Sequence, residues 1–174
     1  MRHCFIVLIS VLFYSNANGQ PVSVNESGLM HAQKIFDFSG KSSSEIYKQS
    51  KMWLNNYYKN PEAVLTGDIE DAAIKGRGHQ SCGAVMKGLI TTCFDLGYRF
   101  AIDIKDGKAR MTINDFEVST DQGAYSAETY CLKNNGEFRT NAQARAIVPG
   151  FESICEGLFS SFEDMFATAA ADDW

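Results

Sequence analysis

The feature that most constrains the fold is a hairpin pattern between Tyr98 and Asp115. Two runs of alternating apolar and polar residues, 98–104 and 109–115, flank the turn sequence Lys105-Asp-Gly-Lys108. Asp-Gly between such runs is the strongest short-range signal for a β-hairpin, and it favours a type I′ turn. The pattern therefore predicts two antiparallel strands joined by a two-residue loop.

The two-residue loop also fixes which residues lie opposite one another. Apolar residues of one run then face apolar residues of the other, and an acid faces a base. The hairpin is therefore expected to have one buried face and one face in water. The predicted pairs are Ile104–Ala109, Ile102–Met111 and Phe100–Ile113 on the buried face, and Asp103–Arg110 on the other.

Two segments have the 3.6-residue apolar periodicity of helices that pack on one side. The first is expected over 42–59, because Ser42 and Glu45 form a capping box and Pro61 ends the helical pattern. The second is expected over 151–170, with apolar side chains on one stripe and acidic ones mostly off it. Both are expected to cover a sheet.

Shorter strands are expected over 33–38, 63–69 and 73–78. Gly76 and Gly78 predict a bulge or a weakened strand in the last of these. The elements in order predict an α+β fold, in which two helices cover one face of an antiparallel sheet in the order strand, helix, strands, helix. Two stretches are less defined: 79–93 fits a strand or a connecting loop, and 119–148 is polar, with an undetected strand expected around 124–132.

The N-terminus has the pattern of a secretory signal peptide over residues 1–19. Arg2 precedes an apolar run of signal-peptide length, and Ala17 and Gly19 supply small residues before a cleavage site at Gln20. An uncleaved membrane anchor and a buried strand are the alternatives for the apolar run. The expected organisation is a signal peptide at 1–19, a linker or N-terminal arm at 20–32, one domain at 33–171 and a tail at 172–174.

The charge balance limits the classes of partner. Sixteen basic against 21 acidic side chains give a net charge of −5, whereas a protein that gathers phosphate backbones by charge is strongly basic. We therefore expect no nucleic-acid partner. After loss of the signal peptide no apolar run reaches the roughly 20 residues of a spanning helix, so we expect no transmembrane segment.

Four cysteines remain after the expected cleavage, namely Cys82, Cys93, Cys131 and Cys155. An even number in an exported chain favours disulfides, and four cysteines allow three pairings that sequence does not decide. Free buried thiols are the main alternative. A zinc site built on His79 and Cys82 with Cys93 and Cys131 is a weaker one, because the paired C-x2-C repeats of zinc sites are lacking.

No catalytic, cofactor-binding or metal-binding residues are predicted. His79 near Cys82 lacks the local signature of a thiol nucleophile. The acidic turn Asp68-Ile-Glu-Asp71 fits a solvated turn better than a calcium site. Gly76 and Gly78 lack the strand–helix context of a phosphate-binding loop.

Residues 33–118 resemble the DUF4468 family of secreted bacterial proteins. The resemblance is carried by the strand Lys34-Ile-Phe-Asp37, the helix with Trp53-x3-Tyr57, the segment Asp68–Gly78 and the hairpin Tyr98–Arg110. It departs from the family at Lys108-Ala-Arg110 and in 119–148. The resemblance implies a TBP-like fold, an exported protein of Bacteroidota-like bacteria located in the periplasm or at the cell surface, and no assigned reaction.

Two functions are carried forward from these observations. The first is an exported, non-catalytic module that binds a protein, a peptide or an envelope component through its sheet face or its aromatic helix. The alternative is an exported hydrolase or thiol enzyme with an unrecognised site. Sequence alone identifies neither the ligand nor the oligomeric state.

Overall fold

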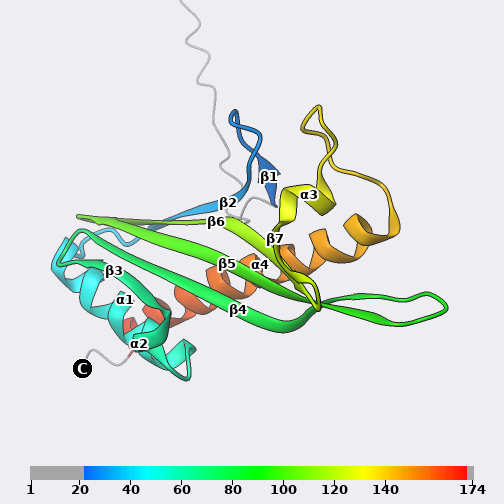
Figure 1. The fold of residues 1–174 in the computed structure, drawn as a ribbon. Helices are drawn as coiled ribbons and strands as arrows, with labels where there is room; N and C mark the ends of the chain where they lie inside the picture. The colour runs from blue at the N-terminus through cyan, green and yellow to red at the C-terminus, as the bar shows by residue number, and fades with distance from the viewer. Residues whose placement is uncertain (1–21, 172–174) are drawn as a thin grey trace, which may run out of the picture.

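The computed structural model of the protein describes residues 22–171 (Figure 1). The expected signal peptide and the tail at 172–174 lie outside the described residues. The strands are β1 (Ser23–Val24), β2 (Met30–Asp37), β3 (Leu65–Ile69), β4 (Ala73–Met86), β5 (Thr92–Lys105), β6 (Lys108–Thr120) and β7 (Gly123–Ser126). The helices are α1 (Ser43–Tyr57), α2 (Pro61–Val64), α3 (Ala127–Cys131) and α4 (Ala142–Ala171).

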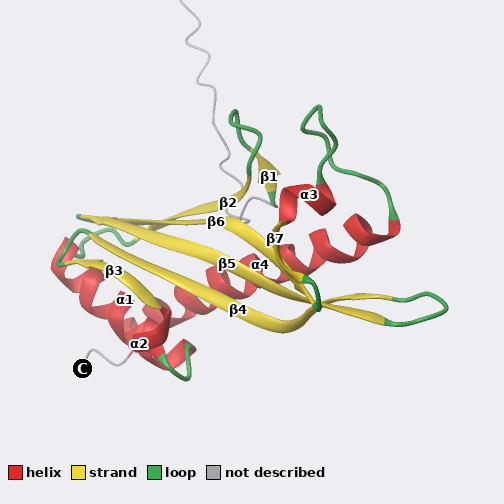
Figure 2. Ribbon diagram, viewed as in Figure 1, coloured by secondary structure: helices red, strands yellow, loops and turns green. Residues whose placement is uncertain are grey.

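The strands form one seven-stranded antiparallel sheet in the order β1-β2-β6-β5-β4-β3, with β7 paired to β6. Helices α1 and α4 lie along one face of this sheet and contact each other (Figure 2). The expected α+β class is confirmed. We call the other face, which bears no helix α1 or α4, the open face.

The β5–β6 hairpin has the predicted register. Every predicted pair is observed, and the apolar members of these pairs are buried on the helix side. On the open face the guanidinium of Arg110 donates to the Asp103 carboxylate at 2.7 Å. Both of these side chains are about half exposed, at 51% and 45%, so the ion pair contributes at most about 1 kcal/mol.

The expected type I′ turn of this hairpin is wrong, because that turn needs positive φ at both central residues. Gly107 has φ 72°, but Asp106 is not among the residues with positive φ. The turn packs against the start of α1 and the loop before it. Asp106 accepts from the Ser43 N–H at 2.7 Å, and the Gly107 N–H donates to the Lys41 carbonyl at 2.9 Å. These tertiary hydrogen bonds set the turn geometry.

Helix α1 begins as its sequence predicts. The Ser42 hydroxyl accepts from the Glu45 N–H, and the Glu45 carboxylate accepts from the Ser42 N–H at 2.7 Å, which completes the capping box. The helix ends at Tyr57, and Pro61 opens the short helix α2. Helix α2 takes the first two residues of the strand expected over 63–69, and the remaining five form β3. Trp53 on its buried stripe is 2% exposed, and its ring packs edge-on against Phe100 of β5.

Gly76 and Gly78 do not form the expected bulge. They lie in regular ladder positions opposite Phe100 and Tyr98, whose rings cover them on the helix side. A Cβ at Gly76 would lie 2.4 Å from Cζ of Phe100, and one at Gly78 would lie 2.2 Å from Cζ of Tyr98. The absence of side chains at these two positions admits the rings, a packing known as aromatic rescue of strand glycines.

Helix α4 begins nine residues earlier than expected, at Ala142 rather than Phe151. Asn141 caps it, since its side-chain oxygen accepts from the Ala144 N–H at 2.9 Å. The helix continues through the exposed residue Pro149, which lacks the N–H that would donate within the helix. The next residue, Gly150, lies so close to β4 that a Cβ would meet the Gly83 carbonyl oxygen at 2.6 Å.

Three loosely defined segments also take on definite structure. Residues 79–93 form the continuation of β4 and the start of β5, with a turn between them, rather than a loop. Within 119–148, β7 overlaps the start of the expected strand, but 127–131 is helical. Part of the expected linker at 20–32 is in the sheet, because β1 pairs with β2 and β2 begins at Met30.

Candidate functional site

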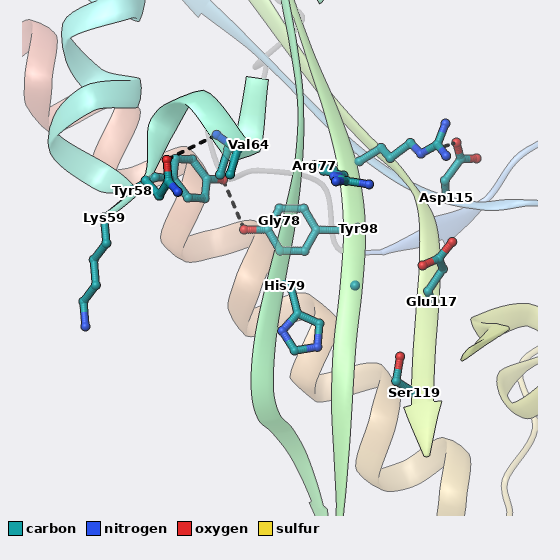
Figure 3. A pocket seen from close by; sticks show the side chains of 14 residues that line it. Tyr58, Lys59, Val64, Arg77, Gly78, His79, Tyr98, Asp115, Glu117 and Ser119 are labelled. Atoms are coloured by element: carbon teal, nitrogen blue, oxygen red, sulfur yellow. Dashed lines mark hydrogen bonds and ion pairs between the residues drawn. The ribbon is translucent and has the colours of Figure 1, made fainter. Parts of the chain in front are cut away.

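The open face is built by strand alternation, which sends every second side chain of β4, β5 and β6 away from the helices. Arg77 of β4 and Arg99 of β5 lie directly opposite each other on this face, and both are exposed. Asp115 and Glu117 of β6 lie on the other side of β5 (Figure 3). Two strands thus present bases where the third presents acids.

A hollow of about 490 Å³ lies over these strands. Its floor includes Gly97 of β5, which pairs with His79 on one side and Glu117 on the other. Because Gly97 has no side chain, a gap remains between the neighbours on β4 and β6. A Cβ there would meet Cβ of Glu117 at 3.3 Å and narrow the hollow.

The outer wall of the hollow comes from α2 and from the residues that connect α1 to it. Lys59, Asn60, Ala63 and Val64 line it, opposite the edge of β4. Figure 3 shows Lys59 extending away on that side, while Arg77 lies over the strands. The hollow therefore runs from α2, across β4 and β5, to β6.

Beneath Gly78 two phenol groups meet on the helix side. The hydroxyls of Tyr58 and Tyr98 are 3.2 Å apart. Burial raises the pKa of Tyr98 to about 12 and raises the pKa of Tyr58 as well. Both phenols are therefore neutral at ordinary pH, so they can donate or accept hydrogen bonds but do not serve as bases.

The charges of the open face are only partly paired. Arg99 lies 3.8 Å from the Asp115 carboxylate, and His79 lies 3.7 Å from that of Asp95. Within residues 22–171, Arg77 has no carboxylate within 4.0 Å. Like charges directly opposite each other destabilise a sheet, and Arg77 lies opposite Arg99 without an acidic partner of its own in that part of the chain.

The cysteines separate into two kinds. Cys82 and Cys93 form a disulfide between β4 and β5, with their Cα atoms 4.9 Å apart. Cys131 and Cys155, the other two candidate disulfide partners, are free and buried in helices. They form no disulfide and pack as small apolar residues of the core. Burial raises the pKa of each of these two thiols to about 12, which keeps them protonated.

A bulge in β4 brings Cys82 within bonding reach of Cys93. The β4–β5 register shifts between Gln80 and Ala84, and Cys82 within the shift has φ 51°. Its N–H donates to the Asp95 side chain at 2.7 Å. The oxidised sulfur supplies no thiolate, so the alternatives of a Cys82 nucleophile and of a zinc site with His79 find no support.

The acidic turn considered for calcium has a structural role. The Asp68 carboxylate accepts from Lys51 at 2.6 Å and from the Tyr47 hydroxyl at 2.7 Å, which ties β3 to α1. The hydrogen bond from Lys51 is the largest cause that lowers the pKa of Asp68. No group of three metal-binding side chains is found in the part of the chain that the structure describes.

Sequence reasoning did not single out Arg77, Gly97, Arg99 or Glu117. The hairpin alternation already assigned Arg99 to the open side, but the β4 register and the shift in the β5–β6 register were needed to bring the four together. His79, considered only with Cys82, lies instead at the rim of the hollow. Among the described helices none is long and apolar enough to cross a membrane.

The helix-backed antiparallel sheet with an open opposite face is the architecture of TBP-like proteins. The family model described as a domain of unknown function with TBP-like fold, DUF4468, matches residues 33–119, and the chain belongs to that family. No curated protein matches the chain.

Two solved structures share the fold. A DUF4468 family protein from Bacteroides ovatus is 16% identical with a TM-score of 0.63, covering 83% of this chain and 90% of that one. A TBP-like protein from Parabacteroides distasonis is 15% identical with a TM-score of 0.67, covering 83% of this chain and 97% of that one. At this identity the likeness shows the fold alone.

Proposed function

We propose that the protein is an exported, non-catalytic, single-domain module that binds an extended polypeptide segment with an acidic side chain. The segment lies in the hollow between α2 and β6, and its carboxylate is held by Arg77 and Arg99. The observation that carries the proposal is this arginine pair, because it places two guanidinium groups opposite each other at the rim of an open hollow.

The chemistry of the pair favours a carboxylate. A guanidinium is a planar fork of donors that matches a carboxylate in two hydrogen bonds. Arg77 is without an acidic partner in residues 22–171, and Arg99 has only a loose one at 3.8 Å. An acidic ligand side chain would remove the repulsion between the two arginines on binding.

The edge of β4 favours an extended chain. β3 pairs with β4 only as far as Gly76, so from Arg77 onward the outer edge of β4 has no strand partner among the described residues. A peptide can add to such an edge through main-chain hydrogen bonds, while alternate side chains reach pockets on one face. The hollow over Gly97 offers room for such a side chain.

Export is supported by two independent features. The N-terminal 19 residues have the signal-peptide pattern, and the Cys82–Cys93 disulfide requires an oxidising compartment to persist. Periplasm or cell surface is therefore the proposed location.

Peptide binding is tested by fluorescence anisotropy on the chain from Gln20 onward. The probe is a labelled peptide of alternating Thr and Glu, compared with the same peptide carrying Gln or Lys in place of Glu. We expect binding of the Glu peptide alone and a loss of about tenfold or more in affinity for Arg77→Ala, since hydrogen bonds to charged groups are the stronger kind.

The matched control is Arg110→Ala, because Arg110 lies on the same open face but is already bonded to Asp103 at 2.7 Å. This variant should bind the Glu peptide as the wild type does. Equal binding of all three peptides, no binding of the Glu peptide, or an equal loss in both arginine variants would contradict the proposed site.

A further inference from the structure

The β4–β5 hairpin extends beyond the rest of the sheet as an arm, defined here as residues 81–94 (Figure 1). Pairing of β5 with β6 reaches only to Asp95, so 84–86 and 92–94 pair with each other alone. The Cys82–Cys93 disulfide crosses the base of the arm. The arm is therefore a two-stranded projection held at its root by a covalent bond.

The tip of the arm is apolar and fully in water. Leu89 is 109% exposed and Ile90 80%, and Val85 on the adjoining strand is 42% exposed. These two adjacent aliphatic side chains gain almost nothing from burial within the fold, because both lie almost wholly in solvent. They are available to contact an apolar surface.

The charge of the arm is opposite in sign to that of the chain. Residues 81–94 contain no Asp or Glu and one base, Lys87, whereas the whole chain has a net charge of −5. Lys87 lies two positions before Leu89, where its long stem can follow the apolar tip while its ammonium group stays at a polar boundary. The arm is thus the part of an acidic protein that suits an anionic surface.

From these observations we infer that the arm inserts its tip, Leu89 and Ile90, into an anionic phospholipid bilayer surface, with Lys87 at the headgroups. Two aliphatic side chains cover only a small part of the roughly 800 Å² per partner that a stable protein interface needs. Insertion into a bilayer needs no complementary partner surface, and its strength scales with the apolar area buried and with the attraction to anionic lipids. Attraction of Lys87 to acidic headgroups adds to this.

The inference goes beyond the proposed peptide site and rests on separate residues. The hollow is lined by β4, β5 and β6 within the sheet, whereas the tip lies at the far end of the arm. Loss of one activity therefore leaves the other measurable.

The test is co-sedimentation of the chain from Gln20 onward with vesicles of phosphatidylglycerol, in parallel with vesicles of phosphatidylcholine. We expect wild type to bind phosphatidylglycerol more tightly. The double variant Leu89→Ser/Ile90→Ser should lose at least about a hundredfold in affinity, since each buried aliphatic side chain is worth about tenfold or more. Lys87→Glu should abolish the preference for phosphatidylglycerol.

The matched control is Ile69→Ser, which removes an aliphatic side chain of 59% exposure from β3, away from the arm. It should bind vesicles as the wild type does. Wild type that does not sediment, or a double serine variant that sediments equally, overturns the inference. So does a lipid-free dimer of the wild type that the double serine variant abolishes, because the tip would then be a protein interface.

Discussion

Replacement of Gly76 by Ala is the sharpest test of how the sheet and its aromatic layer fit together. The new Cβ would lie 2.4 Å from Cζ and 2.6 Å from Cε1 of Phe100. Carbon atoms pack favourably at about 3.5–4.0 Å, so the ring would have to retreat by about 1 Å. Phe100 is 2% exposed and is held between the rings of Trp53 and Tyr58 at 5.9 and 6.0 Å.

The backbone is equally constrained at this position. Gly76 pairs with Leu65 on one side and Phe100 on the other, so it is an interior position of the sheet. Overpacking in a core costs about 1–3 kcal/mol, and the lower entropy of unfolded Ala returns about 0.4–1 kcal/mol. The expected net loss of unfolding free energy is about 1–2 kcal/mol, or a melting temperature lower by about 2–8 °C for a domain of this size.

The assay is urea unfolding followed by far-UV circular dichroism, with Gly67→Ala as the matched control. At Gly67 a Cβ would meet only the Lys75 side chain, at the ordinary distance of 3.5 Å. The control should therefore be neutral or more stable than the wild type by up to about 1 kcal/mol. The same substitution should therefore lower the unfolding free energy at Gly76 but not at Gly67.

A double-mutant cycle with Phe100→Leu assigns the cost to the ring. In the Phe100→Leu background the flat ring is gone, so Gly76→Ala should cost little, which appears as a coupling free energy of about 1 kcal/mol or more. A Gly76→Ala protein that unfolds at the wild-type urea concentration would refute the packing argument. So would a cost that is unchanged by Phe100→Leu.

Three further predictions concern the disulfide, the buried thiols and a helix cap. Cys82→Ser/Cys93→Ser opens a link across a sequence separation of 11, and should lower the unfolding free energy in urea by at most about 3 kcal/mol, the chain-entropy value for so short a loop. The folded chain from Gln20 onward should show no thiol reactive at pH 8 but two in denaturant, because the pKa of Cys131 and Cys155 is raised to about 12. Between about pH 9 and 12 the folded state keeps these protons and the unfolded state loses them, so stability should fall as pH rises, and less steeply in Cys155→Ala. Ser42→Ala removes the hydroxyl that accepts from the Glu45 N–H, and should cost about 1 kcal/mol by thermal melting.

The β5–β6 hairpin was predictable because local and tertiary preferences agree there. The alternation of apolar and polar residues, the Asp-Gly turn and the complementary charges on the open face all specify one register, and that register is observed. The type I′ turn failed since the hydrogen bonds of Asp106 and Gly107 to Ser43 and Lys41 come from a segment more than 60 residues away in sequence. Such contacts leave no local signal.

The start of α4 was missed because Pro149 has the local meaning of a helix boundary. In the folded chain the helix passes through Pro149, because this residue is exposed to solvent and Asn141 caps the true start of the helix. Gly150 likewise reads as a helix breaker, yet it is the point where the helix touches the Gly83 backbone. Tertiary packing outweighs the residue preferences at both positions.

The candidate site could not be predicted because it depends on irregularities in strand pairing. A side-chain period of two assigns a face to each residue only as long as the register is unbroken. The shift between Gln80 and Ala84 and the one between Gly97 and Arg99 each reset that assignment. The first brings Cys82 to Cys93, and the second lies where Arg99 of β5 meets the acidic end of β6. Charged residues whose sequence pattern is that of an ordinary solvent-exposed face therefore lie around Gly97. This arrangement, rather than any sequence motif, gives the open face a geometry suited to binding.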